Sequence, residues 1–173
     1  METFKKISIN GRLAYSIYCL KLFIKEKFIE FSDNQELLFI LNEISEGLNE
    51  KYPENFEQKI TELSPNSILD SHPDNNFKKY TFFKTSELES FKVLYNNLPQ
   101  SVIEIIDSVI ELALCNIYKN TGEYSECTFN ELLYIFQILK REKFNLPIIP
   151  NVIMNSSFNQ NNGWGNSIKL PAL

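Results

Sequence analysis

The only histidine of the chain stands in the stretch DSHPD, where three potential metal ligands alternate with other residues. In an extended segment, Asp70, His72 and Asp74 would point to one side and could converge on a metal ion. The stretch is also rich in turn-forming residues, and the chain has no second histidine to complete a ligand set. A turn is therefore the simpler interpretation. We expect no metal and no cofactor, while metal binding by these three residues stays open.

Nucleophilic catalysis has little support in the sequence. A Ser/His/Asp or Cys/His scheme would have to use His72, and no serine or cysteine stands in a G-x-S-x-G nucleophile elbow. The glycines of GWG precede neither a helix nor a Lys-Ser/Thr pair, as a phosphate-binding loop requires. Carboxylate pairs are abundant, but any acidic helical protein has them. We expect no catalytic residue and no enzymatic activity.

A stripe of glutamates on the second predicted helix is the most informative charged feature. At about 100° per residue, the stripe lies opposite an apolar face, and Phe39 falls within it. A solvated face is the ordinary explanation of such a stripe. An aromatic ring surrounded by charge is instead typical of an interface anchor, unless another helix or the C-terminal tail covers it. The candidate partner-binding residues are Glu36, Phe39, Glu43, Glu46 and Glu50.

A second, shorter acidic strip marks the most apolar segment, SVIEIIDSVIELALCNIY. Apolar residues fill a broad arc of this segment, which predicts a central helix exposed along one strip only. Two acidic surfaces on one small helical domain predict docking of a basic partner. The candidate partner-binding residues of this strip are Glu104, Asp107 and Glu111, with Glu123 and Glu126 as reinforcement from the following loop.

Apolar spacing of three and four residues predicts an all-α fold, a single-domain bundle of about six helices. We expect Asn10 to cap the first helix. A turn-rich connection over 64–85, with a short extended piece at 80–83, interrupts the bundle. The helical core spans about 10–144, and an irregular tail follows over 145–173. The expected helices are 10–31, 35–52, 54–63, 86–97, 100–118 and 129–144.

The charge balance excludes two classes of partner. The chain has 17 basic and 22 acidic residues, a formal net charge of −5. Nucleic acids and anionic membranes both select for an excess of lysine and arginine, so neither is the expected partner. No stretch is long enough and free enough of charge to span a bilayer.

The cysteines and the N-terminal segment predict a cytoplasmic protein. Cys19, Cys115 and Cys127 are odd in number and lack C-x-x-C spacing, which favours reduced thiols buried as small hydrophobic side chains. The segment before Cys19 has the outline of a lipoprotein signal. However, Tyr18 stands where such a signal needs a small residue, and lysines interrupt the apolar region that follows.

The whole chain, rather than one motif, resembles the small all-α immunity proteins of bacterial polymorphic-toxin and contact-dependent inhibition systems. The similarity lies in its size, acidic and helical makeup, richness in lysine, asparagine and isoleucine, and lack of a targeting segment or catalytic residues. The resemblance implies that the protein binds a cognate toxin, often a basic nuclease, and blocks its active site or an essential surface.

Three hypotheses for the function follow, in order of preference. The first is an immunity protein that binds and neutralises a bacterial toxin without catalysing a reaction. The second is a helical adaptor or phage-encoded regulatory protein, and the third is an enzyme that uses carboxylates. A toxin gene directly upstream would support the first hypothesis alone.

The only tryptophan, Trp164, stands between two glycines in the C-terminal tail. Flanking glycines let the backbone turn sharply and aim one large ring. The ring could enter a groove between this protein's own helices, followed by Ile168 and Leu170, or a pocket on the partner. We favour the internal groove and a structural role for Trp164, because an exposed tryptophan on a mobile segment promotes aggregation.

Overall fold

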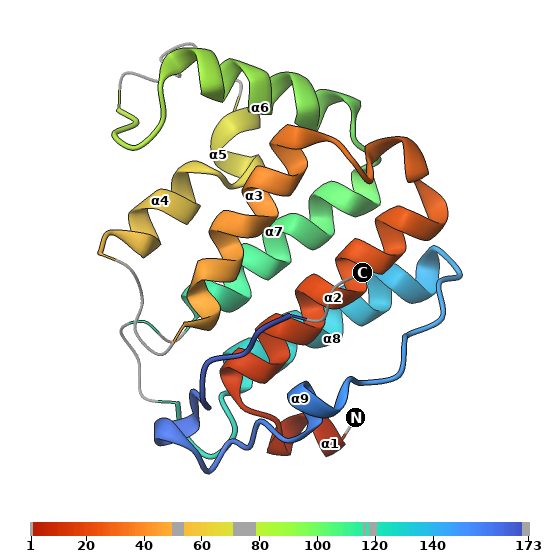
Figure 1. Ribbon diagram of the computed structural model, residues 1–173, viewed down its shortest axis with the longest axis vertical. Helices are drawn as coiled ribbons and strands as arrows, with labels where there is room; N and C mark the ends of the chain where they lie inside the picture. Colours follow the sequence, from red (N-terminus) through yellow and green to blue (C-terminus); the bar gives the residue numbers. More distant parts are fainter. Residues whose placement is uncertain (1, 50–53, 71–78, 116, 118–120, 171–173) are drawn as a thin grey trace.

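The computed structural model describes residues 2–49, 54–70, 79–115, 117 and 121–170 (Figure 1). These residues form nine α-helices and three short 3₁₀ helices. The described residues contain no β-strand, only an isolated antiparallel bridge between Ile7 and Ser157. The prediction of an all-α fold is confirmed.

The helices occur in the order in which Figure 1 colours them from red to blue. The α-helices are α1 (Glu2–Lys6), α2 (Ile9–Lys27), α3 (Gln35–Ser45), α4 (Phe56–Glu62), α5 (Pro65–Leu69), α6 (Thr85–Asn97), α7 (Gln100–Leu114), α8 (Glu126–Arg141) and α9 (Asn151–Met154). The 3₁₀ helices are η1 (Ile29–Phe31), η2 (Glu46–Leu48) and η3 (Asn161–Gly163).

The structure corrects several predicted helix boundaries. Ser8, not Asn10, caps α2, because the Ser8 hydroxyl accepts a hydrogen bond from the Gly11 amide at 3.0 Å. The connection over 64–85 contains α5, and the tail contains α9. Both helices are too short for apolar periodicity to reveal. α8 begins at Glu126, earlier than expected.

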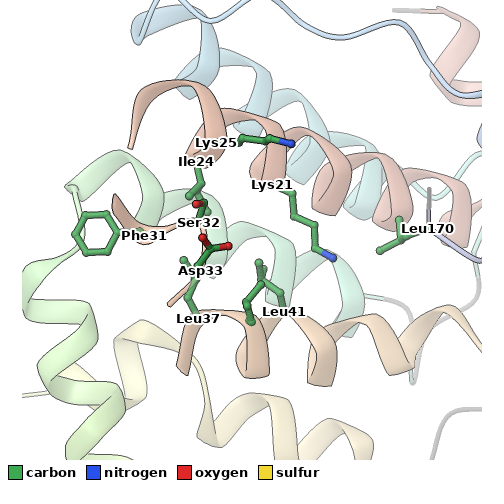
Figure 2. A pocket seen from close by; sticks show the side chains of 10 residues that line it. Lys21, Ile24, Lys25, Phe31, Ser32, Asp33, Leu37, Leu41 and Leu170 are labelled. Carbon is green, nitrogen blue, oxygen red and sulfur yellow. The ribbon is translucent and has the colours of Figure 1, made fainter. Parts of the chain in front are cut away.

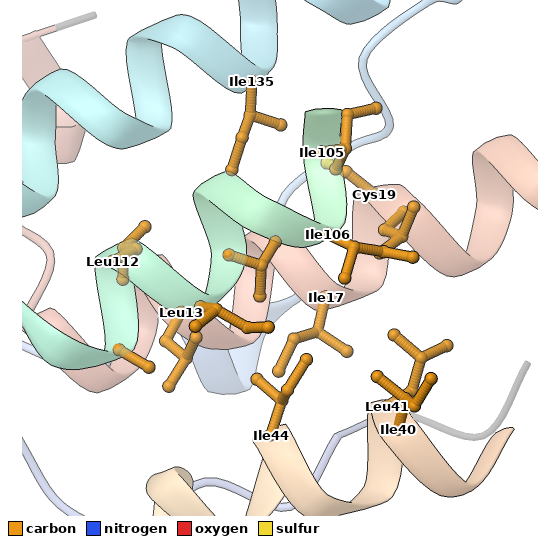
Figure 3. Packing of buried hydrophobic residues seen from close by; sticks show 14 of the residues in the cluster. Leu13, Ile17, Cys19, Ile40, Leu41, Ile44, Ile105, Ile106, Leu112 and Ile135 are labelled. Atoms are coloured by element: carbon orange, nitrogen blue, oxygen red, sulfur yellow. The ribbon is translucent and has the colours of Figure 1, made fainter. Parts of the chain in front are cut away.

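α7 is the central helix of the fold. It contacts α2, α3, α4, α5 and α8, and most of its apolar residues are buried. Figure 3 shows side chains of α2, α3, α7 and α8 meeting in one core. The core residues labelled there include Leu13, Ile17, Ile40, Ile44, Ile105, Ile106, Leu112 and Ile135.

The C-terminal tail packs along the N-terminal segment through backbone hydrogen bonds. The Ser8 amide donates to the Ser156 carbonyl at 2.8 Å, and the Asn10 amide donates to the Trp164 carbonyl at 3.0 Å. Farther along, the Ile168 amide donates to the Leu48 carbonyl at 3.2 Å, and the Ile168 side chain is buried. The Trp164 side chain is partly buried. Gly163 and Gly165 both have positive φ, 95° and 80°, which glycine adopts without strain.

A buried guanidinium joins three segments near this contact. Arg12 of α2 donates to the Phe4 carbonyl at 2.9 Å, to the Ser125 carbonyl at 2.9 Å and to the Thr128 hydroxyl at 2.8 Å. Its side chain is fully buried, and burial lowers the pKa of Arg12 to about 10. Arg12 therefore links α1, α2 and the start of α8.

The cysteines correct another expectation. Cys115 and Cys127 form a disulfide with their Cα atoms 5.9 Å apart, because the chain turns back between α7 and α8. The prediction of three reduced thiols is therefore wrong for these two residues. Cys19 is free and buried, and burial raises the pKa of its thiol to about 12. The cytoplasmic location stays a prediction, without the support that three free thiols would add.

Candidate partner-binding groove

Two adjoining hollows between α3 and α6 form one groove, the α3–α6 groove. The hollows have volumes of about 520 and 230 Å³, and they share Glu36 and Ser90. The larger is lined by Phe31, Asn34, Glu36, Glu89, Ser90, Val93, Leu94 and Asn97, and the smaller by Gln35, Glu36, Phe39, Glu87, Ser90 and Phe91.

Local sequence explains how both walls of the groove form. The Asn34 side chain accepts a hydrogen bond from the Leu37 amide at 2.8 Å and caps α3. The Glu87 carboxylate accepts one from the Lys84 amide at 2.8 Å and fixes the start of α6. Both walls are therefore regular helices with defined first turns.

The charge of the groove is uniformly acidic. Its charged lining residues are Glu36, Glu87 and Glu89. Glu87 is engaged with its own helix terminus. Glu36 and Glu89 form no hydrogen bond or ion pair with any other described residue, so their carboxylates are free to bind a cation.

Apolar side chains remain exposed beside these carboxylates. Phe39 is 39% exposed and Val93 is 62% exposed. The Phe39 ring stacks on Phe91 at 5.8 Å between centroids and meets Phe83 edge-on at 6.1 Å. Since Phe83 and Phe91 are both buried, they hold the Phe39 ring in place before any partner arrives. Phe91 of α6 and Phe83, which precedes α6, thus cover part of Phe39 and leave the rest accessible.

The remaining candidates on α3 and beyond lie outside the groove. Glu43 forms an ion pair with Lys59 of α4, and its side chain is only 17% exposed. Glu46 is exposed, and its carboxylate accepts a hydrogen bond from the Asn49 side chain at 2.9 Å. Glu50 lies outside the described residues. The structure thus brings Glu36 and Phe39 together and separates them from the rest of the predicted stripe.

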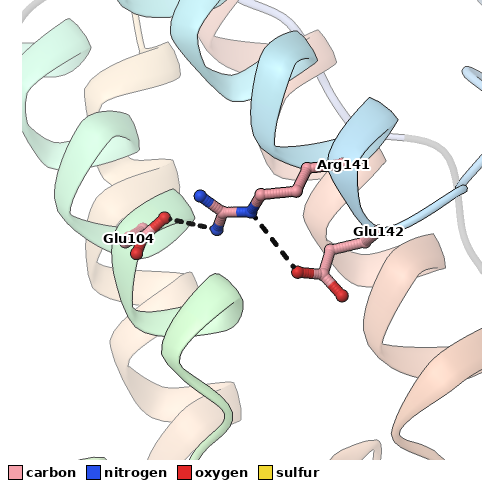
Figure 4. A network of polar contacts seen from close by, with 3 residues as sticks. All are labelled: Glu104, Arg141 and Glu142. Carbon is pink, nitrogen blue, oxygen red and sulfur yellow. Dashed lines mark hydrogen bonds and ion pairs between the residues drawn. The ribbon is translucent and has the colours of Figure 1, made fainter.

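The acidic strip of α7 is largely engaged by this protein's own side chains. Glu104 accepts a hydrogen bond from Arg141 of α8 at 2.7 Å, and Arg141 also contacts Glu142 at 3.6 Å (Figure 4). The Asp107 carboxylate accepts one from the Asn66 side chain of α5 at 2.5 Å. Glu111 is exposed. This strip therefore offers a partner less free charge than the groove does.

Burial raises the pKa values of two carboxyl groups at the α7 strip. Burial, and then the neighbouring Glu111, raise the pKa of the Asp107 carboxyl above its usual range, although hydrogen bonds from Asn66 oppose the shift. The same two causes raise the pKa of Glu131 on α8, a residue that the sequence analysis did not single out.

Within the described part of the chain, no group of three histidine, cysteine or acidic residues is arranged to hold a metal ion. Of the DSHPD stretch, His72 and Asp74 lie outside that part.

Sequence reasoning missed an exposed apolar patch on the tail. Its most exposed member is Ile148, at 91%. The run LPIIPNVIM has no helical period, so its sequence does not tell which side chains face inward. The patch consists of Leu146, Ile148, Val152 and Met154.

Among the described residues, the α3–α6 groove combines two free carboxylates with an exposed, supported aromatic ring, and the sequence analysis selected Glu36 and Phe39 of this set. Comparison of the chain with protein-family models, with curated proteins and with solved structures finds no match. None of the described helices has the length and apolar character needed to cross a membrane. Since no known relative indicates a ligand, we infer the kind of partner from the chemistry of the groove residues.

Proposed function

We propose that this protein binds a basic toxin domain in the α3–α6 groove and neutralises it, as an immunity protein. The observation that carries the proposal is the pairing of two free carboxylates, Glu36 and Glu89, with the exposed ring of Phe39. Charged residues around an aromatic anchor are the usual makeup of a specific protein interface.

The groove suits the basic side chains of such a toxin. A lysine or arginine entering between α3 and α6 would find carboxylates on both walls, Glu36 from α3 and Glu89 from α6. An arginine could also stack on the accessible face of Phe39, which adds a cation–π contribution. Complementary charge would steer the two proteins together, and the apolar contacts would slow their separation.

Co-expression with a candidate basic toxin domain tests the proposed function. We expect growth to be rescued and the two proteins to co-elute as a complex. Toxicity that persists despite equal amounts of soluble protein, together with no complex formation, would contradict the proposal. A complex without rescue would favour the adaptor hypothesis instead.

Reversing the free charges of the groove should slow association. The double variant Glu36→Lys, Glu89→Lys is expected to reduce the association rate constant more than tenfold at low salt, because steering depends on complementary charge. Stopped-flow fluorescence at several salt concentrations measures this rate. Neither carboxylate has a side-chain partner to lose, so the melting temperature should fall only slightly, through the loss of Glu36 from the first turn of α3.

A matched control separates the groove from the total charge. The variant Glu30→Lys, Glu54→Lys changes the net charge equally, at exposed residues that do not line the groove. It should retain most of the association rate. Equal slowing by both variants would show that overall charge, rather than the groove, governs binding.

Truncating Phe39 tests the aromatic anchor. Phe39→Ala is expected to weaken toxin binding by about 2 kcal/mol, mainly through faster dissociation. Tyr134→Ala on α8, where the ring is 45% exposed, is the control and should leave affinity unchanged. Calorimetric titration measures both affinities. A lower melting temperature with unchanged affinity would instead make Phe39 a purely structural contact of Phe83 and Phe91.

A further inference from the structure

A second cavity lies between α2 and α3, on the side of α3 that faces α2 (Figure 2). This α2–α3 cavity has a volume of about 440 Å³, within the range of about 300–1,000 Å³ typical of small-molecule sites. The residues that line it are Lys21, Ile24, Lys25, Phe31, Ser32, Asp33, Leu37, Leu38, Leu41 and Leu170.

Half of the residues that line the cavity are aliphatic. Ile24 comes from α2, and Leu37 and Leu41 come from α3, all three nearly fully buried. Leu170 of the tail lines the cavity at a distance along the chain from both helices and is itself partly buried. An alkyl chain in this space would lose its contact with water, which is the main source of affinity for an apolar ligand.

Two lysines accompany the aliphatic wall. Lys21 and Lys25 stand one turn apart on α2 and therefore lie on the same side of the helix. Neither forms an ion pair or hydrogen bond with another described residue. Asp33 is the only acidic lining residue, so two lysines and one aspartate give the lining a charge of +1.

Among the three charged residues that line the cavity, Lys21 gives the strongest indication of a bound ligand. Figure 2 shows its side chain extending from α2 toward α3, with the ammonium group between Leu41 and Leu170. Lys21 is partly buried, and burial lowers the pKa of its ammonium group. A partly buried cation without a counter-charge is unfavourable, and a bound anion would relieve that cost.

We propose that the α2–α3 cavity binds a medium-chain alkyl carboxylate. Lys21 holds the carboxylate, the exposed Lys25 adds positive charge at the rim, and Ile24, Leu37 and Leu41 contact the alkyl chain. The unpaired lysines favour an anionic head group over a neutral or cationic one. This binding site differs in charge from the acidic α3–α6 groove of the proposed function, although Phe31 lines both.

Calorimetric titration with hexanoate, octanoate and decanoate, below their micelle concentrations, tests the alkyl part of the site. Each buried methylene contributes enough to tighten binding about fourfold, so octanoate should bind about fifteenfold more tightly than hexanoate. Affinity that does not depend on chain length would overturn the proposal, because the aliphatic wall would then take no part. No saturable binding of decanoate would overturn it as well.

Variants of two lysines on the same helix test the head group. Lys21→Met keeps an apolar stem and removes the charge, and it should weaken decanoate binding tenfold or more while leaving 1-decanol binding nearly unchanged. Lys27→Met is the matched control, because Lys27 pairs with Glu26 and does not line the cavity. Equal losses in both variants, or decylammonium binding as tightly as decanoate, would contradict the proposal. Melting curves of both variants verify that the fold is retained.

Discussion

Replacing Arg12 with methionine is expected to lower the free energy of unfolding by about 3–5 kcal/mol. The variant removes the Arg12 donor from the carbonyl groups of Phe4 and Ser125 and from the Thr128 hydroxyl, in a site from which water is excluded. The Ser125 carbonyl still accepts from the Phe129 amide at 3.1 Å, so the Phe4 carbonyl carries most of the cost. Buried polar groups that lose a charged partner carry the full cost of desolvation. Urea denaturation followed by circular dichroism measures the loss.

Two further arginine variants show whether the network, rather than the charge, is responsible. Arg12→Lys keeps the charge but lacks the planar fork that reaches several acceptors at once, so it should recover only part of the stability. Arg141→Met is the surface control, because the Arg141 guanidinium is exposed and its ion pairs with Glu104 and Glu142 are screened by solvent. A loss at Arg141 as large as that at Arg12 would refute this account.

The second large effect is expected at Gly165. Its φ of +80° is unfavourable for any residue with a Cβ atom, and an added Cβ would lie 2.7 Å from the Ser156 hydroxyl and even closer to Ser8. Gly165→Ala therefore combines backbone strain with a clash against the N-terminal segment. We expect a loss of about 3 kcal/mol in the free energy of unfolding.

Gly122 provides a control that has the backbone strain of a positive φ without the steric clash. It also has a positive φ, +60°, but no atom of the described residues lies within 4 Å of an added Cβ. Gly122→Ala should therefore lose only about 1–2 kcal/mol, the cost of the left-handed conformation. Fluorescence of Trp164, the only tryptophan, reports the transition beside the substituted residue. Equal losses in the two variants would mean that the tail does not pack tightly on Ser8 and Ser156.

The main helices of this protein could be predicted because helix formation and the choice of a buried face depend on residues three and four apart. α7 illustrates this: Val102, Ile106 and Val109 recur at helical spacing, and all three are buried. Short elements could not be predicted in the same way. α5 and α9 span too few turns to show a period, and the choice of Ser8 over Asn10 as the cap depends on backbone geometry at one residue.

Only one wall of the groove, the α3 wall, could be predicted from the sequence. The sequence pointed to Glu36 and Phe39 because both lie on one face of a strongly periodic helix. Glu89 and Val93 were missed, since they belong to α6 and become neighbours of that face only when the two helices pack. The same limit applied to Glu104, because its pairing with Arg141 depends on how α8 lies against α7.

The sequence by itself thus determined the all-α class, the principal helices and the acidic character of α3. Only the tertiary structure decided which carboxylates are free, that Cys115 meets Cys127, and that the Arg12 guanidinium is buried among carbonyl groups. The physical reason is that periodicity specifies which face of a helix turns inward but not which residues of another helix it meets. Hydrogen bonds, ion pairs and disulfides require distances of a few ångströms between remote residues, and core packing alone sets those distances.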